Sequence, residues 1–300
     1  MNLELYQKEG TAQLPDFSVN ENLNNPVLYT PSDALKSAVN VALALGQPLL
    51  VTGEPGTGKT QLAYHVAHFF GLGGPLIFNA QTTSVANNLF YNYDALGHFQ
   101  YNQNHREALS TEELEKKFIH YNALGEAIRR NKRMVVLIDE IDKAPRDLPN
   151  DLLFAIESLS FRVSEINKSF QASTTKRPII IITSNSEKNL PDAFMRRVVY
   201  HHIKFPSPKE LLFILSRKTD NLMISDLNAA IDHFYQIRNL NLRKPPSTAE
   251  LIYWVLLLQK MNFNFSKLDR VLSLADRDKL LSSYAVLAKN KEDLEILNNL

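Results

Sequence analysis

Gly53-Glu54-Pro55-Gly56-Thr57-Gly58-Lys59-Thr60 is the stretch that decides the fold of this 300-residue chain. It fits the pattern G-x-x-x-x-G-K-[ST], in which a glycine-rich loop joins a strand to a helix and its N–H groups surround phosphate oxygens. The flanking sequence agrees, because residues 48–52 are a continuous apolar run and residues 60–70 repeat apolar positions at helical spacing. The sequence therefore predicts a phosphate-binding loop between a buried strand and a helix.

Each residue of this loop has an expected role. Lys59 is expected to reach the β- and γ-phosphates of a nucleotide, and the hydroxyl of Thr60 to ligate Mg²⁺. The residues predicted to hold the nucleotide are Gly53, Glu54, Pro55, Gly56, Thr57, Gly58, Lys59, Thr60 and Gln61.

Two acidic residues follow a second apolar strand, in Val135-Val136-Leu137-Ile138-Asp139-Glu140. Asp139 ends the strand, where its carboxylate can hold Mg²⁺ beside Thr60. Glu140 comes next and is suited to activate a water for attack on the γ-phosphate. The metal ligands predicted from the sequence are therefore Thr60 and Asp139, with Glu140 as a catalytic residue.

A third polar position follows another apolar strand, which ends in Thr183-Ser184-Asn185. The side chain of Asn185 can orient the attacking water or touch the γ-phosphate. Asn is also a common turn residue, so this position depends on the other two for its interpretation.

The apolar runs alternate with helical patterns up to residue 205 and give way to helical patterns alone after it. Continuous apolar strands separated by helices are typical of a parallel sheet covered on both faces. The predicted strands are residues 48–52, 75–79, 134–138, 178–183 and 198–205, and the predicted helices include 60–70, 110–131 and 152–159. We expect an N-terminal arm at residues 1–28, an α/β nucleotide-binding domain at 29–205 and a small all-α lid domain at 206–300.

The composition excludes several classes of protein. The chain has 33 Lys and Arg against 32 Asp and Glu, a net charge of +1, so its overall charge does not favour nucleic acid. It has no cysteine, which excludes disulfides and thiolate metal sites. Neither a membrane-spanning run nor a secretory signal is visible, and the expected location is the cytoplasm.

These elements, in this order, resemble the AAA+ ATPases over residues 30–300, and more narrowly the MoxR-type group. The narrower resemblance lies in Ser32-Asp33-Ala34-Leu35, in residues 89–96 and in residues 190–197. It implies that ATP and Mg²⁺ are the cofactors and that Asn185 is the sensor on the fourth strand. It also implies that Arg197 is the arginine finger serving a neighbouring subunit, with the adjacent Arg196 as the other candidate.

The resemblance further implies a ring oligomer, with a hexamer expected, that remodels or activates a protein client. MoxR-type proteins commonly work with a partner carrying a von Willebrand factor A domain. Residues 84–108 match an insertion that contacts substrate in that group, or form a packed surface loop, and residues 162–176 match a hairpin. The lid arginine of many relatives is replaced here near Ala249, which leaves Arg243 or Lys244 as substitutes.

Three other functions are compatible with parts of the sequence. Action on nucleic acid is favoured only by the basic clusters at 129–130, 132–133 and 243–244. Asn290-Lys291-Glu292-Asp293 matches a guanine-reading pattern, but a helical spacing running from Asp276 predicts a helix end there. A slow nucleotide-gated scaffold is disfavoured because every expected catalytic residue type is present.

Overall fold

The computed structural model describes residues 24–105, 109–186, 190–268 and 272–300, and the predicted arm lies outside them as far as residue 23. The chain divides into two compact units. The α/β unit comprises Pro31–Gly53 and Lys59–Ile203. The helical unit comprises Lys204–Leu300 together with Glu54–Gly58 and the described residues up to Thr30.

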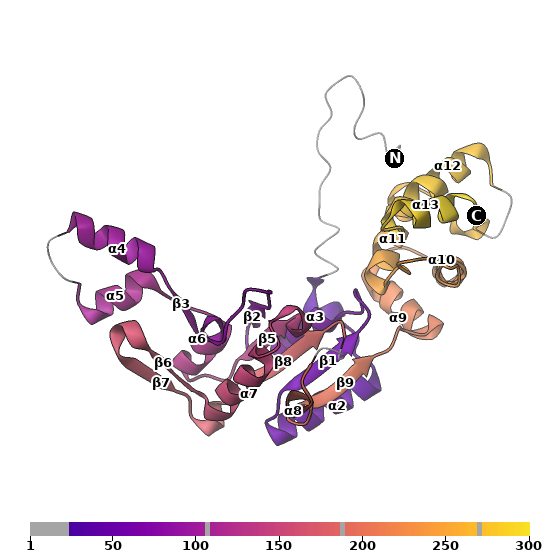
Figure 1. Ribbon diagram of the computed structural model, residues 1–300. Coiled ribbons are helices and arrows are strands. Elements are labelled where there is room, and N and C mark those ends of the chain that lie inside the picture. Colours follow the sequence, from indigo (N-terminus) through magenta and orange to yellow (C-terminus); the bar gives the residue numbers. More distant parts are fainter. Residues whose placement is uncertain (1–23, 106–108, 187–189, 269–271) are drawn as a thin grey trace. The chain divides into compact units, whose positions relative to one another are not determined.

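The α/β unit is built on five parallel strands in the order β2-β5-β8-β1-β9 (Figure 1). The strands of this sheet are β1 (Leu49–Gly53), β2 (Leu76–Asn79), β5 (Val135–Asp139), β8 (Ile179–Ser184) and β9 (Val199–Ile203). The three central strands are almost fully buried along their length, as the continuous apolar runs predicted. The glycine-rich loop follows β1 directly in the chain, as the sequence predicted.

Helices cover both faces of this sheet because its apolar side chains alternate between the two. Val136 and Ile138 of β5 share a core cluster with Leu124 and Ile128 of α6 and with apolar side chains of α7. Val135 and Leu137, on the opposite face, are fully buried on the side covered by α3. The helices of this unit are α2 (Asp33–Leu45), α3 (Lys59–Phe69), α4 (Ala95–Asn104), α5 (Thr111–Phe118), α6 (Ala123–Arg130), α7 (Leu148–Ser158) and α8 (Asp192–Met195).

The single helix predicted for residues 110–131 is wrong. The capping box of Ser110 and Glu113 does start a helix, but α5 ends at Phe118 and α6 begins only at Ala123. Between them, β4 (Ile119–Tyr121) pairs antiparallel with β3 (Tyr91–Tyr93). The apolar residues keep a helical spacing from α5 through to α6, which is why one helix was predicted. Ile and Tyr also favour strands, and pairing with β3 makes residues 119–121 a strand in spite of that spacing.

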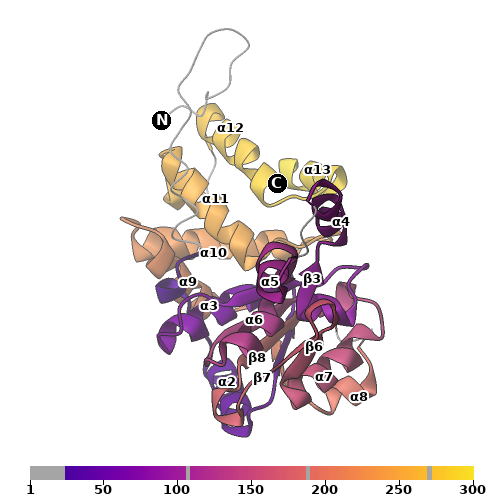
Figure 2. The ribbon, with the colours of Figure 1, turned by 90° about the vertical axis from the view of Figure 1, so that its left-hand side faces the viewer.

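Two small antiparallel sheets flank the β2 side of the main sheet. The β3–β4 pair carries α4 and α5, which lie beyond β2 in Figure 1 and face the viewer in Figure 2. The second pair, β6 (Ser160–Val163) and β7 (Lys168–Gln171), is the hairpin expected within residues 162–176. Phe161 of that hairpin stacks on Phe90, which ties the hairpin to the segment before β3.

The helical unit has its own apolar core around Trp254, Phe234 and Tyr284. Capping boxes that begin at Ser207 and Ser247 open two of its helices. Its helices are α9 (Pro208–Lys218), α10 (Ile224–Arg238), α11 (Thr248–Lys260), α12 (Leu274–Ser283) and α13 (Lys291–Asn298). No helix in the described ranges is long and apolar enough to cross a membrane.

The residues Asn290-Lys291-Glu292-Asp293, which match a guanine-reading pattern, have structural roles within the helical unit. Asn290 caps the start of α13, so the pattern begins a helix rather than ending one. The carboxylate of Asp293 is fully buried and accepts the backbone N–H groups of Arg243 (2.8 Å) and Lys244 (3.1 Å). Burial acts to raise the pKa of Asp293, but these N–H groups and the Asn290 amide outweigh it and hold the pKa below its ordinary value.

Candidate active site

Within the α/β unit, the main sheet brings Thr60, Asp139, Glu140 and Asn185 together at the carboxyl ends of β5 and β8. Lys59 and Thr60 open α3 directly after the glycine-rich loop. The Nζ of Lys59 is buried and donates to the carbonyl oxygen of Gly53 at 2.8 Å. This bond holds the ammonium group against the start of the loop, where phosphate oxygens are expected.

Gly56 and Gly58 give the loop a shape that other residues do not readily adopt. Their φ angles are +73° and +86°, in the left-handed region that favours glycine. A Cβ on Gly56 would also lie 2.3 Å from Oγ of Ser247, both within the helical unit. Without side chains at these positions, backbone N–H groups are free to turn toward an anion, as in phosphate-binding nests.

Thr60 and Asp139 meet directly, although 79 residues separate them in the chain. Oγ1 of Thr60 lies 3.1 Å from Oδ1 and 3.3 Å from Oδ2 of Asp139. Two adjacent ligands of an octahedral Mg²⁺ lie about 2.9 Å apart, given metal–oxygen distances of about 2.05 Å. The hydroxyl and carboxylate oxygens are therefore suitable in both type and spacing for this ion.

Thr183, which the sequence analysis treated only as the end of a strand, connects the two acidic residues. Its buried hydroxyl donates to Oδ1 of Asp139 and accepts the backbone N–H of Glu140 at 2.9 Å. Glu140 has a φ of +56°, which is uncommon for a residue with a side chain. The Thr183 hydroxyl thus fixes the carboxylate of Asp139 and holds the backbone of Glu140 in a strained conformation.

The carboxylate of Glu140 has two partners. Its Oε2 pairs with Nζ of Lys143, and this hydrogen bond holds the pKa of Lys143 above its ordinary value. Its Oε1 accepts from Nδ2 of Asn185 at 3.5 Å. Asn185 and Glu140, the two side chains expected near the attacking water, therefore lie together.

Asp142 positions the chain that carries Asn185. Its Oδ1 accepts from Oγ of Ser184 and from the backbone N–H of Asn185, both at 3.1 Å. This link joins the turn after β5 to the end of β8. Thr183 lies beside Asp139 because β8 pairs in parallel with β5. The sequence does not reveal which strands are neighbours, so it did not point to Thr183.

The two candidate finger residues follow α8 in the chain. Arg196 is the C-terminal cap of α8, and Arg197 comes next; both are exposed. Nε of Arg197 is 3.6 Å from Oε1 of Glu157, and both side chains are more than half exposed. An ion pair at such exposure holds a side chain weakly, so the guanidinium is free to take another partner.

Arg238 of α10 is a basic residue that the sequence analysis missed. Within the helical unit, its Nη2 pairs with Oε2 of Glu54 at 3.0 Å, and its guanidinium lies 3.6 Å from the centre of the Phe205 ring. Arg243, one of the two expected substitutes beside Lys244, pairs with Glu292 at 3.6 Å. Arg238 therefore contacts the loop residue Glu54.

One family model matches the part of the chain that contains most of these residues. Residues 48–198, just over half of the chain, match the family model described as AAA domain (dynein-related subfamily). No curated protein matches the sequence.

Similar solved structures include two variants of RuvB from Thermotoga maritima. A threonine-to-valine variant is 17% identical with a TM-score of 0.46, over 88% of this chain and 69% of its own. An arginine-to-alanine variant is 16% identical with a TM-score of 0.48, and the match covers 89% of this chain and 69% of the variant.

Proposed function

The chain belongs to the dynein-related subfamily of AAA domains, and on that premise we propose that it is a Mg²⁺-dependent ATPase that remodels or activates a protein partner. The observation that carries the ATPase part is the meeting of Thr60, Asp139, Glu140 and Asn185 at one end of the sheet. Bound Mg²⁺ would neutralise charge that develops on the phosphate oxygens.

Each side chain of this cluster has a distinct task in the proposal. The ammonium of Lys59 binds phosphate oxygens, and Thr60 with Asp139 holds the metal. The carboxylate of Glu140 accepts a proton from the attacking water, and the amide of Asn185 orients that water. Departure of Lys143 from Glu140 frees the carboxylate for this role.

The test of the ATPase is the Glu140→Gln variant. We expect it to bind ATP as the wild type does and to lose steady-state phosphate release by 10²-fold or more, since the amide cannot accept the proton. Glu112→Gln, an exposed change on α5, is the matched control and should keep full turnover. Normal turnover in Glu140→Gln would remove Glu140 from the mechanism.

We also propose that the active form is a ring, with a hexamer expected, in which Arg197 or Arg196 completes the site of the next subunit. A finger that serves a neighbour requires a head-to-tail interface, and such interfaces close into rings or continue as filaments. The exposure of both arginines and the weak pairing of Arg197 support this role. Sedimentation with and without ATP measures the assembly.

For the partner, we propose a protein client of the MoxR type, such as a protein with a von Willebrand factor A domain. The β3–β4 sheet with α4 and α5 supports it, because Leu96 and Phe99 are more than half exposed one helical turn apart on α4. Capture with ATP-loaded Glu140→Gln, followed by mass spectrometry, tests this. A client should be retained by this variant and released by Lys59→Ala.

Action on nucleic acid is the alternative, favoured by the basic residues at the end of α6. Arg129 and Arg130 both pair with Glu126, which neutralises part of that charge. Binding of single- and double-stranded DNA should be absent even at low salt, where phosphate contacts are strongest. Salt-dependent binding there would favour the alternative.

A further inference from the structure

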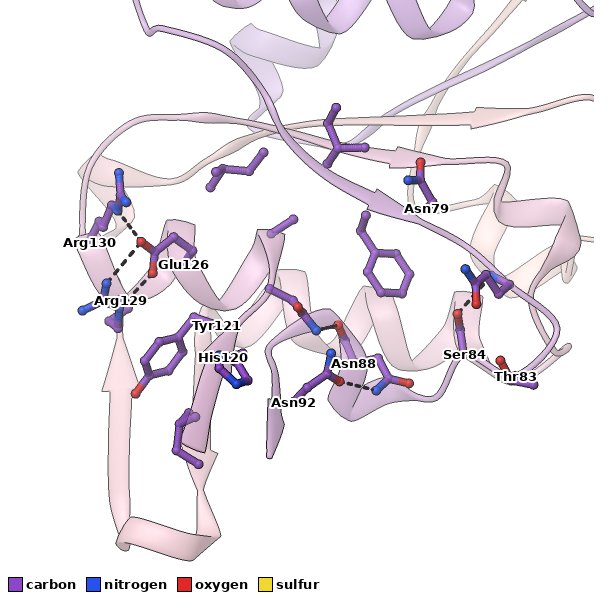
Figure 3. Close-up of a pocket in the computed structure, with 17 residues that line it drawn as sticks. Asn79, Thr83, Ser84, Asn88, Asn92, His120, Tyr121, Glu126, Arg129 and Arg130 are labelled. Carbon is purple, nitrogen blue, oxygen red and sulfur yellow. Dashed lines mark hydrogen bonds and ion pairs between the residues drawn. The ribbon is translucent and has the colours of Figure 1, made fainter. Parts of the chain in front are cut away.

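An open groove of about 940 Å³ runs along β2, on the side of the strand that no other described strand occupies (Figure 3). All four residues of β2 line it, although their side chains alternate between the faces of the sheet. The groove therefore borders the edge of the strand rather than one face. Its far side is formed by Asn92 of β3, by β4 and by α6, from Ala123 at its start to Arg130 at its end.

The backbone of β2 offers this groove hydrogen-bonding groups that no other described residue occupies. The N–H of Ala80 donates to the carbonyl of Asp139 at 2.9 Å, which directs alternate residues, including Phe78, toward β5. In a parallel pair, the residues between them direct both N–H and C=O outward. Ile77 and Asn79 thus present two donors and two acceptors along an exposed edge.

The side chains around the groove suit a peptide backbone. Within the described part of the chain, the side chains of Asn79, Gln81 and His120 make no hydrogen bond, and all three residues are exposed. Carboxamides carry both donors and acceptors, as a peptide bond does. The groove can therefore form hydrogen bonds with the backbone of an extended peptide, whatever side chains that peptide carries.

The groove is charged at one end only. Figure 3 places Arg129 and Arg130 at the end opposite Asn79. Since β2 runs toward Asn79, the arginines lie beside its beginning. Both pair with the largely buried Glu126, which leaves one net positive charge on two partly exposed guanidinium groups.

We propose that this groove binds an extended segment of a partner protein, which pairs antiparallel with β2 and carries acidic residues at its C-terminal end. Antiparallel addition places that end beside the beginning of β2, where Arg130 can take a carboxylate. Strand addition of this kind draws affinity from main-chain bonds and specificity from the surroundings. The site is separate from the nucleotide site, and it stands whether or not the chain hydrolyses ATP.

The test is fluorescence anisotropy without nucleotide, using labelled ten-residue peptides of alternating valine and serine. One peptide ends in three aspartates and a second in three lysines. A third repeats the first with alternate backbone nitrogens methylated, which removes the pairing donors. We expect the first to bind at least about tenfold more tightly than either of the others.

Two variants and a matched control separate charge from backbone pairing. Arg130→Glu should reverse the preference to the lysine-ended peptide, and Lys132→Glu, an exposed neighbour outside the groove, should leave it unchanged. Ile77→Pro removes an outward N–H at an edge strand, where proline is tolerated, and should weaken binding of the first peptide at least about fivefold. Circular dichroism checks its folding, and the methylated peptide tests pairing even if this variant unfolds.

Equal binding of the methylated peptide, or equal effects of Arg130→Glu and Lys132→Glu, would overturn the proposal. A change of oligomeric state in Ile77→Pro without any peptide binding by the wild type would also overturn it, since the groove would then be a contact between copies. The assay contains no ATP, so the peptide-binding result can be interpreted even if the chain proves not to be an ATPase.

Discussion

Replacing Thr183 by valine tests whether one buried hydroxyl holds the two acidic residues in place. Valine has nearly the same shape, so the change removes the hydroxyl and leaves the packing in place. Two hydrogen bonds are lost: the one to Oδ1 of Asp139 and the one from the N–H of Glu140. Neither residue is itself altered, which makes this a test of positioning.

The expected effect on stability follows from those two bonds. A buried N–H left without a partner costs about 1–3 kcal/mol, and loss of a bond to a charged group costs about 1.5–3 kcal/mol. Asp139 is partly exposed and keeps Thr60 as a partner, so losing its bond to Thr183 costs about 1.5 kcal/mol or less. A total of about 3 kcal/mol lowers the melting temperature of the α/β unit by about 6–12 °C.

The expected effect on catalysis is larger than the effect on nucleotide binding. Without its N–H bond, the backbone of Glu140 is held less firmly in the left-handed conformation at φ +56°. Its carboxylate then shifts, and a displacement of about 1 Å lowers kcat about 10²-fold. The affinity for ATP should stay within about threefold, because Lys59 and the loop are unchanged.

Thr183→Ser is the matched control, since it keeps the hydroxyl and removes only a methyl group. Differential scanning calorimetry and steady-state phosphate release measure the two effects at a temperature where both variants are folded. If Thr183→Val keeps the kcat of the wild type while Thr183→Ser behaves the same way, the hydroxyl does not position Glu140 and the reasoning fails.

Three further predictions concern the interface and the two units. Arg197→Ala should lose ATPase activity alone and regain part of it when mixed with Lys59→Ala, whose finger is intact; no rescue in confirmed mixed oligomers would count against a shared site. Asp293 has a folded pKa below its unfolded value of about 3.9, so its stabilisation is present above about pH 4 and is lost as the pH falls through the folded pKa. Asp293→Asn should therefore flatten the acid dependence of denaturant midpoints and leave nucleotide choice unchanged. Gly125→Ala, normally favourable in a helix by about 0.5–1 kcal/mol, should instead destabilise the protein, because the new Cβ would lie 1.9 Å from the carbonyl oxygen of Phe90; an unchanged melting temperature would show that this contact relaxes freely.

The sequence alone determined the local elements that carry the fold. The glycine-rich loop, the continuous apolar strands and the capping residues Ser207 and Ser247 each act within a few positions, so their physical effect is readable from neighbours in the chain. The same locality made residues 53–60 recognisable as a phosphate loop. It also misled at residues 119–121, where helical spacing continued through a segment that pairs with a distant strand.

Only the tertiary structure decided which side chains meet. Thr183 lies beside Asp139 because β8 is inserted next to β5, and strand order depends on packing over the whole unit rather than on local sequence. The same holds for Arg238, which contacts Glu54 from 184 positions away, and for the open edge of β2. Contacts between residues far apart in the chain arise from register and burial together, and no single segment contains that information.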